Sequence, residues 1–300
     1  MAISWIFTPS ARSQFTPHIS SQLSTINKHH LSLVNPWVSD SVFMGKLYTA
    51  MTLGLAAYIY PEIIDADFRK SALADLHSLA QYIIAPLIFT PFIAYRIFFI
   101  KNLSNIYLNR ATGKILYQRN KKLISFDWTN IKGGVFKRTE FGGSSFSTSY
   151  ALALAFAPPR KDGSLHKKDC LWVDSNEPTE PGVKHVAEVW EYLRHFMDHG
   201  PDKLPPPGEP NWWHKPLHAI CLTPAEAWRH YAPWRTGEPG EMQGKKNWQL
   251  PFWAVLFPYN LSIALCWYGI CRLFNVRAAP PPPEAFEEAP AHSTQKGKRT

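Results

Sequence analysis

Residues Ser78 to Ile100 form the stretch that decides the fold, SLAQYIIAPLIFTPFIAYRIFFI. Few of these residues are strongly polar, and Lys101 closes the run. The hydrocarbon core of a bilayer is about 30 Å thick and takes roughly 17 to 25 mostly apolar helical residues to cross, so this length predicts a transmembrane helix. Pro86 and Pro91 predict a kink, since neighbouring helices can satisfy the carbonyls that a proline leaves free.

Two further stretches have the length and apolar character of spans. Val42–Tyr60 contains Lys46 one turn inside its start, where a lysine can extend its ammonium to the interface. Leu250–Phe274 carries Pro258 and Asn260 in its interior and aromatic residues toward both ends, as interfacial belts do. The sequence therefore predicts a transmembrane hairpin over residues 42–100 and a third apolar segment, 250–274, that either spans the membrane or re-enters it.

Basic residues beside the spans predict the orientation of the chain. From Lys101 to Lys122 there are six basic residues and no acid, whereas Pro61 to His77 holds two basic and four acidic residues. Lysine and arginine close to a span are retained in the cytosol, so residues 101–249 are predicted to be cytosolic and the loop 61–77 external. Three full spans would place the residues after Phe274 outside, and a re-entrant third segment would leave them in the cytosol.

The formal net charge of +9 follows from this topology without a nucleic-acid partner. No zinc-knuckle spacing, recognition-helix pattern or base-stacking motif accompanies the charge. Five basic residues leave the membrane with the chain and are predicted to contact anionic lipid headgroups: Arg110, Lys114, Arg119, Lys121 and Lys122. The alternative is that they only orient the chain during insertion and then sit solvated.

Short alternating runs bounded by turn signals follow the hairpin and predict antiparallel strands. The expected strands are Ile106–Arg110, Lys114–Arg119, Lys122–Trp128, Gly134–Thr139, Ser145–Ala157 and Cys170–Asp174. A helix is predicted over Val183–His199, where apolar residues including Trp190 recur at helical spacing and Gly200-Pro201 ends the pattern. A meander closed by one C-terminal helix resembles the pleckstrin-homology-like fold, so residues 101–200 are expected to form one cytosolic antiparallel β roll in an α+β membrane protein.

Three segments outside these elements are polar or biased in composition. Residues 1–41 have few periodic apolar positions and predict a poorly ordered cytosolic extension. Residues 201–249 form a connector rich in proline and tryptophan that resembles an interfacial belt, and its Thr223-Pro224-Ala225-Glu226 capping box predicts a short helix over Pro224–Tyr231. Residues 275–300 are predicted to be disordered and include a run of four prolines.

Recognisable catalytic motifs are not found in the sequence. His195 and His199 lie four apart on the predicted helix, but no third or fourth metal ligand lies nearby, so they are interpreted as its solvated face. Gly133-Gly134 and Gly142-Gly143 are interpreted as hairpin turns rather than as a phosphate-binding loop. The sequence thus predicts no enzyme, no cofactor and no metal site, with an unrecognised membrane enzyme or an oligomeric channel as the alternative.

The run IYLNRATGKILYQRNKKLISFDW (Ile106–Trp128) and the run WEYLRHFMDHGPDKLPPP (Trp190–Pro207) follow a membrane hairpin. In this they resemble an uncharacterised family of bacterial inner-membrane proteins whose genes often sit beside those of type VI secretion effectors. The resemblance implies an inner-membrane protein with its main domain in the cytosol, either an immunity protein against a membrane-acting effector toxin or an accessory protein that helps to load an effector. The residues themselves predict a non-catalytic anchor that presents a basic β domain to a protein partner or to lipid.

Overall fold

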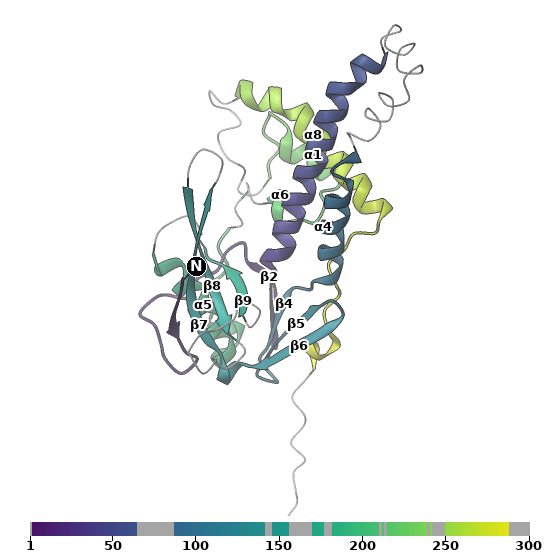
Figure 1. Cartoon of the computed structure of the whole chain (residues 1–300). Helices are drawn as coiled ribbons and strands as arrows, with labels where there is room; N and C mark the ends of the chain where they lie inside the picture. Colours follow the sequence, from purple (N-terminus) through teal and green to yellow (C-terminus); the bar gives the residue numbers. More distant parts are fainter. Residues whose placement is uncertain are drawn as a thin grey trace, which may run out of the picture. The chain divides into compact units, whose positions relative to one another are not determined.

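The chain folds into two compact units whose segments alternate along the sequence (Figure 1). The computed structural model describes residues 2–64, 87–141, 146–155, 170–176, 182–209, 212, 215–238, 241 and 250–287. The β unit is built from residues 1–34, 105–208 and 280–300, and the helical unit from residues 35–104 and 209–279. The sequence analysis divided the chain into consecutive domains. In the structure each unit is assembled from separate segments, and the chain passes between the units at 34/35, 104/105, 208/209 and 279/280.

The β unit contains two antiparallel sheets. The first has the order β2-β3-β4-β5-β6, with strands Leu23–Ile26, His30–Leu33, Ile106–Asn109, Lys114–Arg119 and Lys122–Asp127. The second has the order β1-β7-β8-β9, with strands Ala2–Phe7, Lys132–Phe141, Phe146–Ala155 and Cys170–Asp174. The six strands predicted between residues 106 and 174 are confirmed as strands, but the expectation of one sheet is wrong because they divide between two.

The N-terminal residues are part of these sheets, so the expected poorly ordered extension is wrong. β1 pairs with β7, where Ser4 lies opposite Val135. β3 pairs with β4 and buries Leu31 and Leu33 completely. These strands are short, polar residues separate them, and their partners lie far along the chain, so local periodicity did not reveal them.

Gly133 and Gly134 lie inside β7 and not in a hairpin turn, which corrects the prediction for this pair. A Cβ atom on Gly133 would lie 2.8 Å from the ring of Trp190, and one on Gly134 would lie 2.8 Å from the ring of Trp5. Glycine is needed here because two large rings approach the strand closely. The other predicted turn, Gly142-Gly143, lies outside the described residues.

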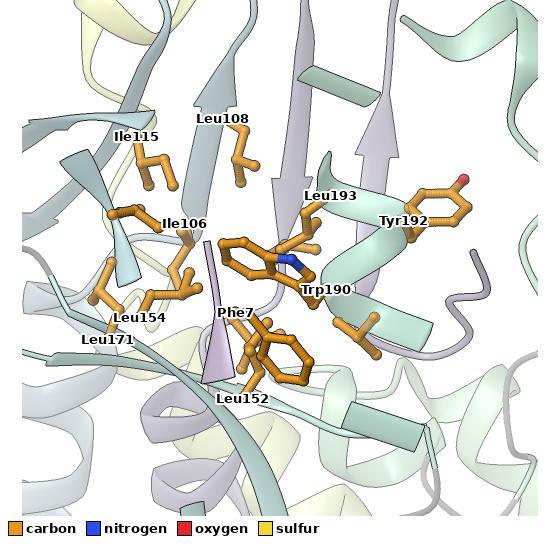
Figure 2. Close-up of a cluster of buried hydrophobic side chains, with 14 of the residues drawn as sticks. Phe7, Ile106, Leu108, Ile115, Leu152, Leu154, Leu171, Trp190, Tyr192 and Leu193 are labelled. Atoms are coloured by element: carbon orange, nitrogen blue, oxygen red, sulfur yellow. The ribbon is translucent and has the colours of Figure 1, made fainter. Parts of the chain in front are cut away.

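The core of the β unit is organised around α5, Lys184–His199, as predicted. Val186, Trp190 and Leu193 are each 0% exposed, so the predicted buried face of the helix is confirmed. Figure 2 shows the indole of Trp190 in the middle of the cluster, while Tyr192 points away on the other side of the helix. The Trp190 ring stacks on Phe7 at 5.7 Å and on Trp128 at 5.2 Å between ring centroids. Two short 3-10 turns also belong to this unit, Trp128–Asn130 after β6 and Pro201–Lys203 after α5.

The helical unit contains α1, Pro36–Ile64, α4, Thr90–Asn102, and α8, Leu250–Leu273. Pro36–Ile59 and Leu250–Leu273 are long and apolar enough to be membrane spans. α1 begins at Pro36 rather than Val42 because the Asn35 side chain accepts a hydrogen bond from the Trp37 amide at 3.1 Å, ahead of a proline at the first helical position. Of the predicted second span, α4 is described, and residues 78–86 lie outside the described residues.

Two short helices lie in the connector, α6, Lys215–His218, and α7, Pro224–Tyr231. The predicted capping box of α7 is confirmed in both directions. The Glu226 amide donates to the Thr223 hydroxyl at 3.3 Å, and the Thr223 amide donates to the Glu226 carboxylate at 2.8 Å.

The first residues of the expected disordered tail are ordered, and this part of the prediction is wrong. A 3-10 turn, η6, spans Pro283–Phe286 and packs on β4 and β5 in the β unit. Proline-rich composition suggested disorder, but a proline segment needs no hydrogen bonds of its own and can lie extended on a sheet.

Candidate membrane interface

The helical unit carries many of its large apolar side chains on the outside. Tyr58 of α1 is 73% exposed and Val255 of α8 is 74% exposed. Only 28% of the most apolar part of α1 and 17% of that of α8 is buried, whereas the core helix of a soluble protein is mostly buried. The exposed set comprises Trp37, Phe43, Leu47, Met51, Tyr58, Leu87, Ile88, Phe92, Tyr95, Phe98, Trp228, Trp234, Leu250, Phe252, Val255, Leu256, Tyr259, Leu265, Leu273 and Phe274. An apolar surface of this kind marks contact with a membrane or with another protein.

One end of this unit is closely packed. A Cβ atom on Gly45 of α1 would lie 2.3 Å from the Trp267 ring of α8, so the two helices meet at a position where glycine is required. The Trp267 indole is fully buried and donates to the Ile220 carbonyl at 2.7 Å. The Lys101 ammonium at the end of α4 donates to the Phe274 carbonyl at the end of α8 at 3.1 Å. The start of α1 and the ends of α4 and α8 therefore lie together.

Lys46 belongs to this packed end. It was predicted to extend its ammonium to the interface, but its Nζ donates instead to the carbonyl of Pro216 in the connector. A charged lysine within an apolar helix is tolerated when it finds such a carbonyl. The contact ties α1 to α6.

The connector runs alongside α8 over much of its length. Ile220 meets Trp267, Trp228 packs on Phe257 at 5.0 Å, and Trp212 packs on Trp253 at 5.6 Å. Trp253 and Trp267 are about 21 Å apart along an ideal helix. The tryptophan-rich connector is therefore packed on the helix.

A part-buried ion pair joins two segments of the connector. The Glu238 carboxylate accepts from the Lys215 ammonium at 2.7 Å and from the Trp212 indole at 3.0 Å. His230 stacks on Trp212 at 4.1 Å, with its Nδ1 3.4 Å from Glu238. A buried charge needs such partners, and this set positions the chain. Sequence reasoning missed it because the members are scattered through the connector without a motif.

The five basic residues predicted to face lipid do not form one surface. Arg110 lies at the C-terminal end of α5, where its guanidinium donates to the carbonyls of Met197 at 3.3 Å and Asp198 at 3.5 Å. These are carbonyls that a helix end leaves without intrahelical partners, and a cation there also complements the helix dipole. Arg110 therefore supports the fold of the β unit.

The other four lie on the β5–β6 hairpin, but at its two ends. Lys114 is opposite Asp127 across the strands, while Arg119 is opposite Lys122. Six strand residues place Lys114 about 17 Å from Arg119. Arg119, Lys121 and Lys122 are exposed and gather at the turn, where Lys121 has a φ of 62°. We call these three residues the hairpin tip.

His195 and His199 lie side by side on α5, with ring centroids 4.6 Å apart. In the described part of the chain no group of three or more histidine, cysteine or acidic side chains could hold a metal ion. Burial, followed by the neighbouring His199 and Arg194, lowers the pKa of His195. The pair therefore favours a neutral His195 on a half-buried helix face.

An apolar groove lies on the helical unit between α1, Phe89 and Tyr259, with a volume of about 510 Å³. Its lining contains no acidic, basic or histidine side chain. Such a lining suits contact with apolar chains.

Comparison with known proteins gives a family and no relative of known activity. No curated protein matches the chain. No solved structure matches it either. The one family found covers α4, the six strands β4–β9, α5, the connector, α8 and η6, which together are most of both units. The chain belongs to this family, DUF6708, a family of unknown function that matches residues 83–287.

Proposed function

We propose that this protein is a non-catalytic protein of the bacterial inner membrane, whose helical unit lies in the bilayer and whose β unit presents a cytosolic surface to a protein partner. The observation that carries the proposal is the contrast in burial between the units. α1 and α8 are only 28% and 17% buried over their most apolar parts, while the core residues of α5 are fully buried. Apolar helix surface of this extent is stable against lipid and costly against water.

The way in which segments of the two units alternate along the sequence constrains the membrane topology of such a protein. Residues 1–34, 105–208 and 280–287 belong to one compact β unit, so they lie on one side of a membrane. The six basic residues from Lys101 to Lys122 favour the cytosolic side. The segment 209–279 then starts and ends in the cytosol. This supports a cytosolic tail over the external one that three full spans would give.

The packing of the connector along α8 suits this even number of crossings. Trp212 contacts Trp253 near the start of α8, Ile220 contacts Trp267 near its end, and Trp228 contacts Phe257 near the start again, so the connector doubles back along about 21 Å of helix. We infer that residues 209–279, with the connector packed on α8, re-enter the membrane as one body, which departs from the predicted cytosolic position of residues 209–249. The part-buried Glu238–Lys215 pair fits this role, because a charge taken into an apolar setting needs its partner with it.

The partner we propose is an effector of a type VI secretion system, with the protein acting either in immunity or in effector loading. Support comes from the sequence resemblance and from the tethering of the β unit, which the chain joins to the helical unit at four points. Tethering holds a cytosolic surface close to the membrane that a membrane-acting toxin must reach. The hairpin tip is a candidate contact for anionic lipid in this arrangement.

Deletion of the gene in a strain that carries a neighbouring effector gene tests the proposal. An immunity protein predicts self-killing that disappears when the effector gene is also deleted. A loading protein predicts viable cells that no longer deliver that effector but still deliver others. Cells that are viable and deliver every effector normally would contradict both roles and favour an enzyme or a channel.

A further inference from the structure

The five-stranded sheet of the β unit has a second buried face that its own core does not explain. Along β4, Ile106 and Leu108 point into the core cluster, and Tyr107 and Asn109 alternate to the other face. Tyr107 is 8% exposed and Asn109 is 1% exposed. Polar side chains on an outer sheet face are normally solvated. Here residues 280–287 cover them.

Asn109 recognises the main chain of this covering segment. Its Nδ2 donates to the carbonyls of Ala285 at 3.2 Å and Glu287 at 2.8 Å, with a longer contact to Glu284 at 3.4 Å. The Thr112 amide donates to the Asn109 Oδ1 at 3.2 Å, which fixes the orientation of the amide. The Glu284 and Ala285 carbonyls belong to the 3-10 turn η6, so Asn109 recognises the main chain of a turn that follows the prolines.

An aromatic contact accompanies the backbone contacts. The ring of Phe286 lies edge-on to His30 at 4.7 Å and to Tyr107 at 6.2 Å. Burial, and then the neighbouring His29, lower the pKa of His30, which favours the neutral form of its ring. Phe286 is still 47% exposed, whereas Ala285 is fully buried. The segment is therefore held by backbone hydrogen bonds, by the buried Ala285 and by the half-exposed ring of Phe286.

The covering segment, residues 280–287, begins with a proline run like those of polyproline ligands. Pro280–Pro283 form a proline run, and Pro282 has φ −65° and ψ 143°, close to polyproline II. Polyproline segments bind aromatic-lined grooves because they are already extended and lose little entropy. Tyr107, His30 and Asn109 contact residues 284–287, which directly follow the proline run, and this arrangement has the features of a peptide-recognition site.

We propose that the face formed by His30, Tyr107 and Asn109 is a docking groove for a segment of a partner protein in which a proline run leads into a 3-10 turn with an aromatic residue three or so positions after the prolines, and that residues 280–287 occupy it in cis until that partner displaces them. This inference rests on the proposed function only in assigning the groove to a partner. The groove itself stands on the contacts above. In cis the segment acts at a high effective concentration and so masks the groove.

Peptide binding to the full chain and to two variants in detergent tests the groove. The probe is a fluorescent peptide with the sequence of residues 280–287. One variant ends after Ala279, and the other is Phe286→Ala in the full chain. We expect the peptide to bind the shortened chain at least about tenfold more tightly than the full chain, and Phe286→Ala to lie between them. A peptide with alanine at the position of Phe286 is the matched control and should bind at least about tenfold more weakly.

The remaining outcomes overturn the proposal. If the shortened chain keeps its near-ultraviolet circular dichroism and binds no peptide, the groove has no affinity for an exchangeable ligand. If that variant unfolds and Phe286→Ala gains no binding, the segment is a fixed part of the fold. Dimers held by exchanged residues 280–287 would make a second copy of the chain the occupant, and not a partner. Since none of these measurements depends on a secretion system, their failure is distinct from failure of the gene-deletion test.

Discussion

The two units place the same kinds of side chain in opposite environments. In the β unit Trp190 is 0% exposed and has ring neighbours on both faces. In the helical unit Val255 is 74% exposed and Tyr58 is 73% exposed. The β unit is stabilised by its own core, whereas the helical unit exposes large apolar side chains along helices long enough to span a membrane. From this difference we expect the stability of the β unit to come from its own core and that of the helical unit to depend on the lipid or detergent around it.

The largest effect expected from this contrast is on solubility. The protein should stay with the membrane pellet through washes with high salt and alkaline carbonate, and detergent should release it. Salt weakens only interactions between charges, while apolar surface keeps its preference for lipid at about 25 cal/mol per Å². Sedimentation followed by immunoblotting measures it. Release by salt or carbonate would mean that the exposed apolar surface covers another protein instead.

Within the β unit, Trp190→Ala should cost roughly 3 to 5 kcal/mol of unfolding free energy, because it leaves a cavity in a closed core. Trp228→Ala in the helical unit is the control, since Trp228 is 46% exposed and should lose much less. Hydrogen exchange of the β7 and β8 amides in detergent reports the free energy of opening for the β unit. Equal protection in both variants would show that Trp190 does not hold the core.

A matched glycine pair tests the helical unit. Gly45→Ala should destabilise it by about 1 to 3 kcal/mol, because the new Cβ meets the Trp267 ring at 2.3 Å. Gly54 lies on the same helix with nothing within 4 Å of its Cβ position, so Gly54→Ala should stabilise by up to about 1 kcal/mol through helix propensity. Thermal unfolding in detergent compares them. Two variants with the same midpoint would contradict the α1–α8 packing.

The smallest effect concerns the hairpin tip. A spin label at Asn120 should be less accessible to water in nanodiscs with anionic lipid than in neutral nanodiscs. A spin label at Thr129, at the other end of the hairpin, is the control. Lys121→Gln with Lys122→Gln should remove the difference, since each basic residue near a charged leaflet contributes about 1 kcal/mol. High salt should reduce it by shortening the Debye length. Equal accessibility in both lipids would leave these charges with an orienting role alone.

Local signals predicted the elements whose determinants lie close together in sequence. The alternation in Lys114–Arg119, the helical spacing around Trp190 and the capping box at Thr223 each contain their own evidence, and the structure has all three elements. The apolar segments 42–60 and 250–274 were recognised for the same reason, because length and composition suffice to identify them.

The rest depends on pairings that no local pattern contains. Leu31 and Leu33 read as isolated apolar residues until β4 is placed beside them. Phe286 gains a role only through Asn109 and His30, and Glu238 only through Lys215. The five basic residues were grouped by their closeness in sequence, and a single strand of β structure then separated Lys114 from the hairpin tip.

Labelling of single cysteines tests the central claim most directly, after Cys170, Cys221, Cys266 and Cys271 are replaced by alanine. New cysteines at Asp67, Lys121 and Glu287 are treated with a membrane-impermeant maleimide in intact cells. The account predicts that only Asp67→Cys reacts, and that Lys121→Cys and Glu287→Cys react after the cells are permeabilised. Reaction of Glu287→Cys but not Lys121→Cys in intact cells would contradict the account, because it would place two parts of one β unit on opposite sides of the membrane.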